Sequence, residues 1–154
     1  MDIQLRLVTR DNWEECLNLK VSRLQTKFTP TVAVSLAKPY IKPDGEHVEY
    51  LPFAIYYGEV IVGFIMHAFE KETTDMYWIN GFIIDEKYQG KGYGKSALAE
   101  MIRWIASHSP QCKEVRLTVY PENQIARRLY INFGFLPTGY FHGEEEVLAF
   151  SMRQ

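Results

Sequence analysis

The sequence lacks most of the features that would assign it at once to a specialised class of protein. Only two of its 154 residues are cysteines, Cys16 and Cys112, and their spacing supports neither a disulfide framework nor a zinc site. The formal net charge is −2, so nothing electrostatic favours a nucleic-acid partner. The first residues lack the basic stretch and apolar core of a secretory signal, and we expect a cytoplasmic protein.

Long apolar runs and biased segments are also missing. Hydrophobic residues make up 47% of the chain and charged residues 23%, which is ordinary globular composition and argues against disorder and against a membrane span or membrane partner. There is no internal repeat and no low-complexity segment. A chain of 154 residues has the usual size of one domain, so we expect a single domain over residues 1–154 with a sizeable core.

The most informative stretch lies between residues 79 and 96. An apolar, β-branched run over residues 79–84 has the pattern of a buried strand, and a helical pattern begins after three alternating glycines. Glycine allows positive φ and a close approach of the backbone to a ligand. Where such a turn opens a helix, the unpaired first-turn amides and the helix dipole can bind phosphate oxygens, so the stretch predicts a strand, an anion-binding loop and a helix.

The spacing of the glycines separates several nucleotide-binding designs. The dinucleotide fingerprint G-x-G-x-x-G needs a glycine where Lys95 stands, and the phosphate loop of NTPases needs one at Gln89. The pattern that fits is Gln-x-x-Gly-x-Gly at Gln89, Gly92 and Gly94, which resembles the pyrophosphate-binding signature of the GNAT superfamily of N-acetyltransferases. Lys91 and Lys95 add positive charge beside it. The alternative is a flexible surface turn.

Apolar periodicity predicts the strands. Gly58-Glu59 suits a two-residue hairpin turn, and Gly81 indicates a bulge or a close backbone approach within its strand. His67 follows a run that is apolar on both faces, and we interpret it as a hydrogen-bonded structural histidine rather than a base. The predicted strands cover residues 3–7, 53–57, 60–66, 76–84, 115–119, 136–141 and 147–152.

Helical spacing predicts three regular helices. The first begins at residue 13, where Asp11 or Asn12 can cap it, and extends to about residue 20. The second follows the glycine loop, and the third runs from residue 123 to a glycine at 134. Between residues 21 and 50, prolines including Pro39 interrupt helical pieces, and we expect this segment to face the substrate.

A second motif narrows the choice of cofactor. The segment from Asn123 to Phe135 resembles the second coenzyme A signature of the GNAT family, N-x-x-A-x-x-L-Y-x-x-x-G-F, and every specified position matches. The resemblance implies an α/β (α+β) GNAT-like fold, with a central mixed, mostly antiparallel sheet of about seven strands and helices on both faces. Within the family, the run from Phe82 to Gly92 looks most similar to bacterial spermine/spermidine acetyltransferases.

The resemblance also implies which residues hold acetyl-CoA as co-substrate, and it implies no metal. Tyr130 is the implied catalytic residue, since a protonated phenol near the thioester sulfur can donate a proton, although its place on an apolar stripe also suits a core aromatic. Asn123 is implied to bond the pantetheine arm, and it can equally cap a helix. The implied coenzyme-binding residues are Phe82, Ile83, Ile84, Gln89, Gly90, Lys91, Gly92, Tyr93, Gly94, Lys95, Ser96, Asn123 and Ala126.

The implied reaction is direct transfer of the acetyl group to a primary amine, with a polyamine such as spermine or spermidine as the expected acceptor. Another small amine, an amino sugar or a protein N-terminus are alternative acceptors, and a non-catalytic acetyl-CoA-binding module or an NTP-binding domain are alternative functions. The resemblance leaves a homodimer open. Related polyamine enzymes carry an acid where this chain has Asn80, which cannot act as a base. The acids available instead are Glu49, Glu59, Asp75 and the run Glu144-Glu145-Glu146, which the sequence does not place against the acceptor.

Overall fold

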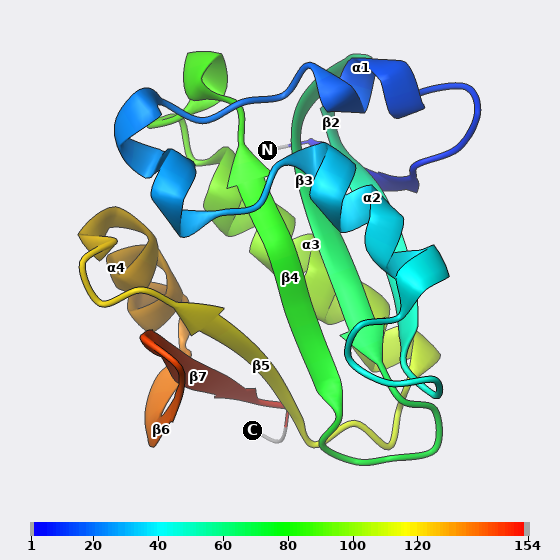
Figure 1. Cartoon of the computed structure of the whole chain (residues 1–154), viewed down its shortest axis with the longest axis vertical. Coiled ribbons are helices and arrows are strands. Elements are labelled where there is room, and N and C mark those ends of the chain that lie inside the picture. Colours follow the sequence, from blue (N-terminus) through cyan, green and yellow to red (C-terminus); the bar gives the residue numbers. More distant parts are fainter. Residues whose placement is uncertain (1, 153–154) are drawn as a thin grey trace.

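The computed structural model describes residues 2–152, which form one seven-stranded sheet with helices on both faces (Figure 1). The order of the strands is β1-β2-β3-β4-β5-β7-β6. The strands are β1 (Ile3–Leu7), β2 (Glu49–Tyr57), β3 (Val60–Phe69), β4 (Tyr77–Ile84), β5 (Glu114–Val119), β6 (Leu136–His142) and β7 (Glu145–Ser151). The helices are α1 (Trp13–Leu17), α2 (Val32–Ile41), α3 (Tyr93–His108) and α4 (Gln124–Phe133), with 3-10 helices η1 (Arg23–Phe28) and η2 (Glu86–Tyr88).

The sheet is antiparallel except where β4 meets β5. These two strands run parallel and are paired in register only at Trp78 and Arg116. Beyond that pair they diverge toward the end where the glycine loop and α4 lie (Figure 1). The predicted mixed, mostly antiparallel sheet is therefore confirmed, and it is split along part of its length between β4 and β5.

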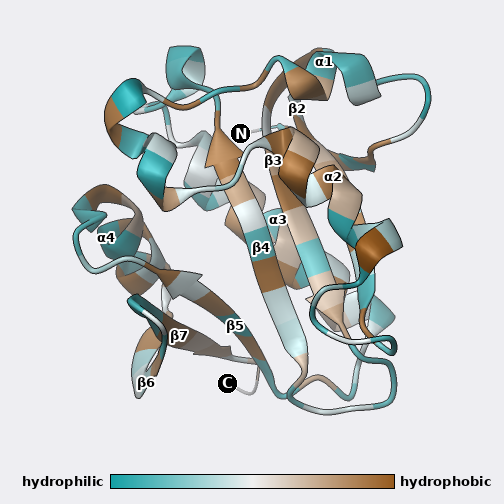
Figure 2. Cartoon of the chain, viewed as in Figure 1, coloured by the Kyte–Doolittle hydropathy of each residue, from teal (hydrophilic) through white to brown (hydrophobic). Residues whose placement is uncertain are grey.

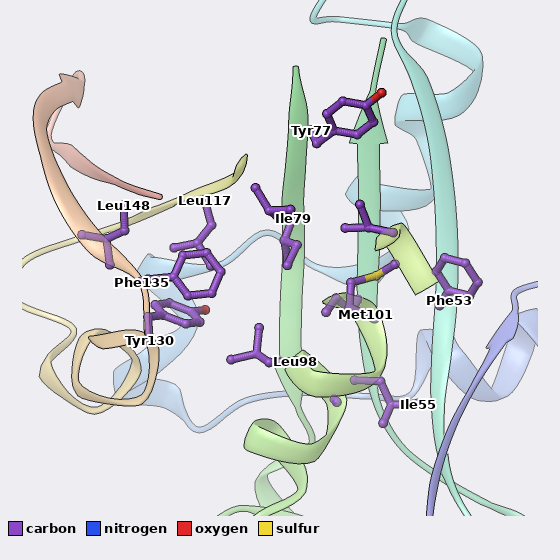
Figure 3. Packing of buried hydrophobic residues seen from close by; sticks show 14 of the residues in the cluster. Phe53, Ile55, Tyr77, Ile79, Leu98, Met101, Leu117, Tyr130, Phe135 and Leu148 are labelled. Atoms are coloured by element: carbon purple, nitrogen blue, oxygen red, sulfur yellow. The ribbon is translucent and has the colours of Figure 1, made fainter. Parts of the chain in front are cut away.

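Two apolar layers cover the sheet. In Figure 2, β4 alternates brown segments with paler and teal ones. Nearly every residue of β3 is buried, as expected for a strand covered on both faces. One layer packs the buried stripe of α3, which includes Leu98 and Met101, against Phe135 and Leu148 near α4 and β7 (Figure 3). The other layer packs the segment containing α1 and α2 against β2 and β3. The two layers cover opposite faces of the sheet, so the split between β4 and β5 opens between them.

Gly81 shows why β4 bends at its middle. The pairing register between β3 and β4 shifts between Phe64 and Met66, so β4 holds the bulge that the sequence predicts. The φ angle of Gly81 is +58°. A Cβ atom at this position would lie 2.5 Å from Oγ of Ser35 on α2, so Gly81 also allows α2 to approach the sheet closely.

The helices differ from the sequence prediction at two places. Helix α1 ends at Leu17, and Asn12 does not cap it, because its Oδ1 accepts a hydrogen bond from the amide of Thr9 instead. Pro39 lies inside α2 rather than interrupting it. A proline so close to a helix C-terminus removes only one intrahelical hydrogen bond, and α2 ends two residues later, at Ile41.

His67 is the buried structural histidine that the sequence predicts. Its side chain is fully buried, stacks on Phe69 and donates from Nδ1 to the carbonyl oxygen of Trp78 at 3.0 Å. Its Nε2 has no hydrogen-bond partner within residues 2–152. Burial lowers the pKa of His67 to about 4, because the charged ring would lose its hydration.

The buried histidine should make the protein less stable in weak acid. The unfolded chain binds a proton at His67 below about pH 6.5, whereas the folded protein does so only near pH 4, so unfolding takes up a proton in this window. Between pH 7 and 4.5 this group should lower the free energy of unfolding by roughly 2 kcal/mol. Urea unfolding of the parent and of His67→Gln at both pH values measures the difference. Exposed His47→Gln is the control, and an equal loss in all three proteins would contradict the assignment.

Candidate active site

The first cavity lies at the open end of the split between β4 and β5. It is bounded by the last residues of β4, the glycine loop, the start of α3, one side of α4 and the η1 segment. The lining residues are Val21, Gln25, Thr29, Phe82, Ile83, Ile84, Tyr88, Gln89, Gly90, Gly92, Tyr93, Gly94, Asn123, Ile125, Ala126, Leu129 and Tyr130. The structure therefore brings most of the implied coenzyme-binding residues together around one cavity.

The glycine loop has the geometry of an anion-binding turn. Gly90 and Gly92 have φ angles of +77° and +87°, and α3 begins directly after Gly92. The first amides of a helix have no intrahelical acceptors and carry the positive end of its dipole. The amide of Ser96 already donates to the carbonyl oxygen of Gly92, so the free donors end at residue 95.

Three of the implied residues do not line the first cavity: Lys91, Lys95 and Ser96. The two lysines are exposed beside the loop, where an ammonium group can approach a phosphate from solvent. Ser96 follows the loop in the first turn of α3. The two lysines therefore add positive charge near the cavity, and Ser96 forms part of the first turn of α3, but none of the three forms the cavity wall.

Gln89 holds the loop in place. Its Nε2 donates to the carbonyl oxygen of Ile84 at 2.8 Å and to Oε1 of Gln25 at 3.0 Å. These bonds tie the turn before the glycines to the end of β4 and to η1. Sequence reasoning assigned Gln89 to coenzyme binding, and the structure adds that its side chain fixes the conformation of the loop.

Tyr130 projects from α4 toward the split. Its side chain is 8% exposed, and the centroid of its ring lies 6.3 Å from that of Phe82 and 5.9 Å from that of Phe135. Figure 3 shows the ring of Tyr130 beside that of Phe135. Burial raises the pKa of Tyr130 well above its usual range, because the phenolate would be desolvated. The phenol therefore stays protonated at neutral pH and can serve as a proton donor. Both the core interpretation and the implied donor role agree with this position.

Asn123 precedes α4 without capping it. Its side chain makes no hydrogen bond to the first amides of the helix, so the predicted cap is wrong. Its φ and ψ angles of −80° and 72° lie outside the extended conformation typical of a capping residue. The carboxamide of Asn123 instead lines the first cavity and the cavity beside it.

A second cavity adjoins the first on the α2 side of β4. The two cavities share Thr29, Phe82, Asn123 and Tyr130. The other residues that line the second cavity are Phe28, Pro30, Lys38, Ile79, Asn80, Gly81, Leu117, Thr118, Val119, Tyr120 and Glu145. Tyr130 therefore lies where two ligands entering from the two cavities would meet.

A third cavity, of about 370 Å³, continues from the second along the sheet. The second and third cavities share Lys38, Asn80, Thr118 and Glu145. The remaining lining residues of the third cavity are Asp44, Val48, Ala68, Phe69, Glu70, Met76, Trp78 and His142. Three carboxylates and one ammonium group line this cavity, so its charge favours a cation.

The structure distinguishes among the acids that the sequence offers as possible bases. Glu49 pairs with Lys71 at 3.4 Å and Glu59 with Arg6 at 3.3 Å, and Asp75 is exposed. None of these three acids lines the three cavities.

The three consecutive glutamates also differ in their surroundings. Glu144 is exposed in the β6–β7 turn, and Glu146 forms a two-point ion pair with Arg127, which lowers the pKa of Glu146. Glu145 lines the second and third cavities. The structure therefore leaves Glu145 as the one acid of these six that faces a cavity described above.

Sequence reasoning missed several residues of the cavity walls. Val21, Gln25 and Thr29 line the first cavity, and Phe28 and Lys38 line the second. All lie in the segment predicted to face the substrate, but no motif marked them individually. Alternation along β7 could have separated Glu145 from Glu146, because neighbouring side chains of a strand point to opposite faces.

Comparison with known proteins agrees with this geometry. Residues 14–135 match the family described as "Acetyltransferase (GNAT) family". The chain belongs to the GNAT acetyltransferase family. As a GNAT protein it is an acetyl-CoA-dependent N-acetyltransferase.

Individual relatives extend the match over nearly the whole GNAT chain. It is 35% identical to "Spermine/spermidine N(1)-acetyltransferase" of Bacillus subtilis (strain 168), over 96% of this chain and 98% of that one. Among solved structures, spermidine N-acetyltransferase of Vibrio cholerae, in complex with CoA and spermine, superposes with a TM-score of 0.73 at 16% identity, over 97% of this chain and 95% of that one. AAC(6')-Ib, in complex with ribostamycin and coenzyme A, superposes with a TM-score of 0.77 at 16% identity, over 99% and 95%.

Within residues 2–152, no helix is long and apolar enough to cross a membrane. The same part of the chain contains no group of three or more His, Cys, Asp or Glu side chains that could hold a metal ion.

Proposed function

We propose that this GNAT protein transfers the acetyl group of acetyl-CoA directly to a primary amine of a polyamine such as spermine or spermidine. The observation that carries the proposal is the continuity of the three cavities. We assign the first to the coenzyme; Tyr130 lies at its junction with the second, and the carboxylates that line the third are Asp44, Glu70 and Glu145. The 35% identical relative from Bacillus subtilis, named for spermine and spermidine, supports the same acceptor class.

The residues in and beside the first cavity have distinct roles in this proposal. The amides that follow Gly90 and Gly92 hold the pyrophosphate, and Lys91 and Lys95 add long-range attraction. Ile83 and the edge of β4 that faces the split, together with Asn123, hold the pantetheine arm. This places the thioester beside Tyr130, whose protonated phenol donates to the departing sulfur.

The third cavity accounts for a long polycationic acceptor. Its carboxylates lie beyond the junction at Tyr130, so they can hold the distant ammonium groups of an acceptor whose terminal amine reaches the thioester. Lys38 is the only lysine or arginine among the lining residues of the third cavity. A monoamine would fill only the second cavity and would leave these carboxylates unpaired.

Acetyl-CoA should stabilise the protein against heat, whereas ATP and NAD should do so much less. A ligand that binds only the folded state raises the free energy of unfolding by about 2.7 kcal/mol at a hundred times its dissociation constant. The measurement is the thermal midpoint with each ligand at matched concentration. Equal shifts for the three ligands would contradict a coenzyme A site.

The acceptor itself is tested by thiol release from acetyl-CoA with a panel of amines. The panel contains spermine, spermidine, a simple monoamine, an aminoglycoside and a peptide with a free N-terminus. We expect the highest kcat/KM with the polyamines. Preferential acetylation of the peptide or the aminoglycoside would show that the acceptor belongs to that class and is not a polyamine. Binding of acetyl-CoA without transfer to any amine would indicate a non-catalytic module.

A further inference from the structure

The proposed reaction needs a proton acceptor that the expected position does not supply. An alkyl amine has a pKa near 10.4, so at neutral pH only about one molecule in several thousand is neutral and nucleophilic. Asn80 lines the second cavity from β4, and its carboxamide cannot accept this proton. On the basis of the proposed function, another group of this chain must therefore accept the proton.

Glu145 occupies the opposite wall of the same cavity. It is the first residue of β7, and its side chain is half-buried. Asn80 and Thr118 each lie two residues beyond the paired residues Trp78 and Arg116, so they face each other across the split on the same side of the sheet. The side chain of Glu145 reaches Thr118 and therefore the level of Asn80.

Thr118 fixes the orientation of this carboxylate. Its hydroxyl donates to Oε1 of Glu145 at 3.0 Å. Oε2 of Glu145 accepts no hydrogen bond from residues 2–152, so this oxygen is left for a group in the cavity. The neighbouring Glu146 is turned to the other face of β7 and is held by Arg127. Strand β7 thus carries two neighbouring carboxylates: Glu146 is held in an ion pair, and Glu145 can interact with a group in the cavity.

We propose that Glu145 is the catalytic proton acceptor for the acceptor amine, held in place by Thr118. It lines the second cavity together with Tyr130, so the cavity contains a proton acceptor and a proton donor. The two groups come from β7 and α4, which both lie on the β5 side of the split. Glu145 also lines the third cavity and Tyr130 also lines the first, so an amine that enters through the third cavity meets the base before it meets the thioester.

The step balances in protons and bonds. The ammonium group gives one proton to Glu145, and its nitrogen then attacks the thioester carbonyl carbon. As the carbon–sulfur bond breaks, Tyr130 donates its proton to sulfur. The nitrogen loses its second proton, which restores the phenol, and Glu145 releases the first proton to solvent. The products are the acetylated amine, the free thiol of coenzyme A and one proton.

Other charged and titratable groups face the same space. Lys38 lines the second and third cavities from α2, and His142 lines the third from the end of β6. Tyr120, directly after β5, and Tyr130 on α4 line the second. Asp44 and Glu70 line the third cavity, farther from the thioester. Asp44 already accepts a hydrogen bond from the hydroxyl of Tyr50 at 2.6 Å, and neither of these two acids lines the second cavity.

The test compares Glu145→Gln with Glu144→Gln in the full chain, using the polyamine that the parent protein acetylates best. Both changes remove one negative charge at neighbouring positions where β7 begins, but Glu144 lines none of the three cavities. A general base is typically worth ~10²–10⁴-fold in rate. We expect kcat to fall about a hundredfold or more for Glu145→Gln at pH 7 and to stay near the parent value for Glu144→Gln.

The pH profile separates a base from a binding group. Without the base, the enzyme can use only amine that is already neutral in solution, and this fraction rises about tenfold per pH unit below the amine pKa. The deficit of Glu145→Gln relative to the parent should therefore narrow from pH 7 to pH 9. Thr118→Val, which removes the positioning hydrogen bond, should lower kcat less, with the same trend.

Three results would overturn the assignment. They are an unchanged kcat for Glu145→Gln, a raised KM for the polyamine with kcat unchanged, and a deficit that stays constant with pH. An unchanged acetyl-CoA dissociation constant for Glu145→Gln verifies that the fold and the first cavity are intact. Failure of the parent protein to acetylate any amine would overturn the proposed function itself. If the parent acetylates an amine and both variants do so at the parent rate, only the role of Glu145 is overturned.

Discussion

Replacing Tyr130 with phenylalanine should lower the turnover number about a hundredfold. The change removes only the hydroxyl, so the ring keeps its packing against Phe82 and Phe135. A general acid is typically worth ~10²–10⁴-fold in rate. We expect the low end of this range, because a thiolate with a pKa near 8.5, like that of a cysteine, departs tolerably without help.

The dissociation constant of acetyl-CoA should barely change in Tyr130→Phe. A phenol that acts in the transition state contributes little to binding of the ground state. The measurement is steady-state turnover and acetyl-CoA binding for both proteins under conditions where chemistry limits the rate. Tyr140→Phe is the matched control, because Tyr140 is 71% exposed on β6. Unchanged turnover for Tyr130→Phe would return this residue to a packing role.

Replacing Gly92 with valine should weaken acetyl-CoA binding about tenfold or more. Gly92 has a φ of +87° directly before α3, and a left-handed conformation costs an L-residue roughly 1–2 kcal/mol. A tenfold change in affinity corresponds to about 1.4 kcal/mol. The loop can escape this strain only by moving the amides that we propose to hold the pyrophosphate. The coenzyme dissociation constant measures the effect, with circular dichroism as the test of folding.

Gly139→Val is the matched control for the glycine loop. Gly139 has a φ of +86° and lies in β6, with open space around its Cβ position. Its replacement introduces the same backbone strain far from the coenzyme cavity, so it should lower stability and leave coenzyme affinity unchanged. If Gly92→Val folds and binds acetyl-CoA as tightly as Gly139→Val does, the loop assignment is wrong.

Local sequence was enough to predict features that depend on neighbouring residues. The glycine loop was visible because strand, turn and helix signals follow one another within eighteen residues. The bulge at Gly81 was predicted for a related reason, since glycine inside a strand has few other roles. His67 was correctly interpreted as structural, because no partner for catalysis stood near it in the chain.

Features that depend on long-range packing could not be predicted in this way. The separation of Glu145 from Glu146 follows from the register of β7 against β5 and from the position of Arg127 on α4. The side-chain cap expected from Asn123 failed because its φ and ψ angles lie outside the extended conformation of a capping residue, and this residue lines two cavities instead. The wall formed by η1 carries no motif, and its place at the cavity depends on contacts such as that of Phe28 with Tyr120.

The single paired position between β4 and β5 has a mechanical consequence. The sheet has a seam, because Trp78 and Arg116 form the only register pair that joins its two halves within the described residues. Side-chain packing, such as that of Phe135 and Leu148 against α3, therefore provides most of the connection between the β5–β7 half and the rest of the sheet, and we expect this half to open more readily than the other half. Residues of β4 line one side of the first cavity and residues of α4 line the other. A coenzyme bound there would contact both halves of the sheet and make the domain unfold more cooperatively.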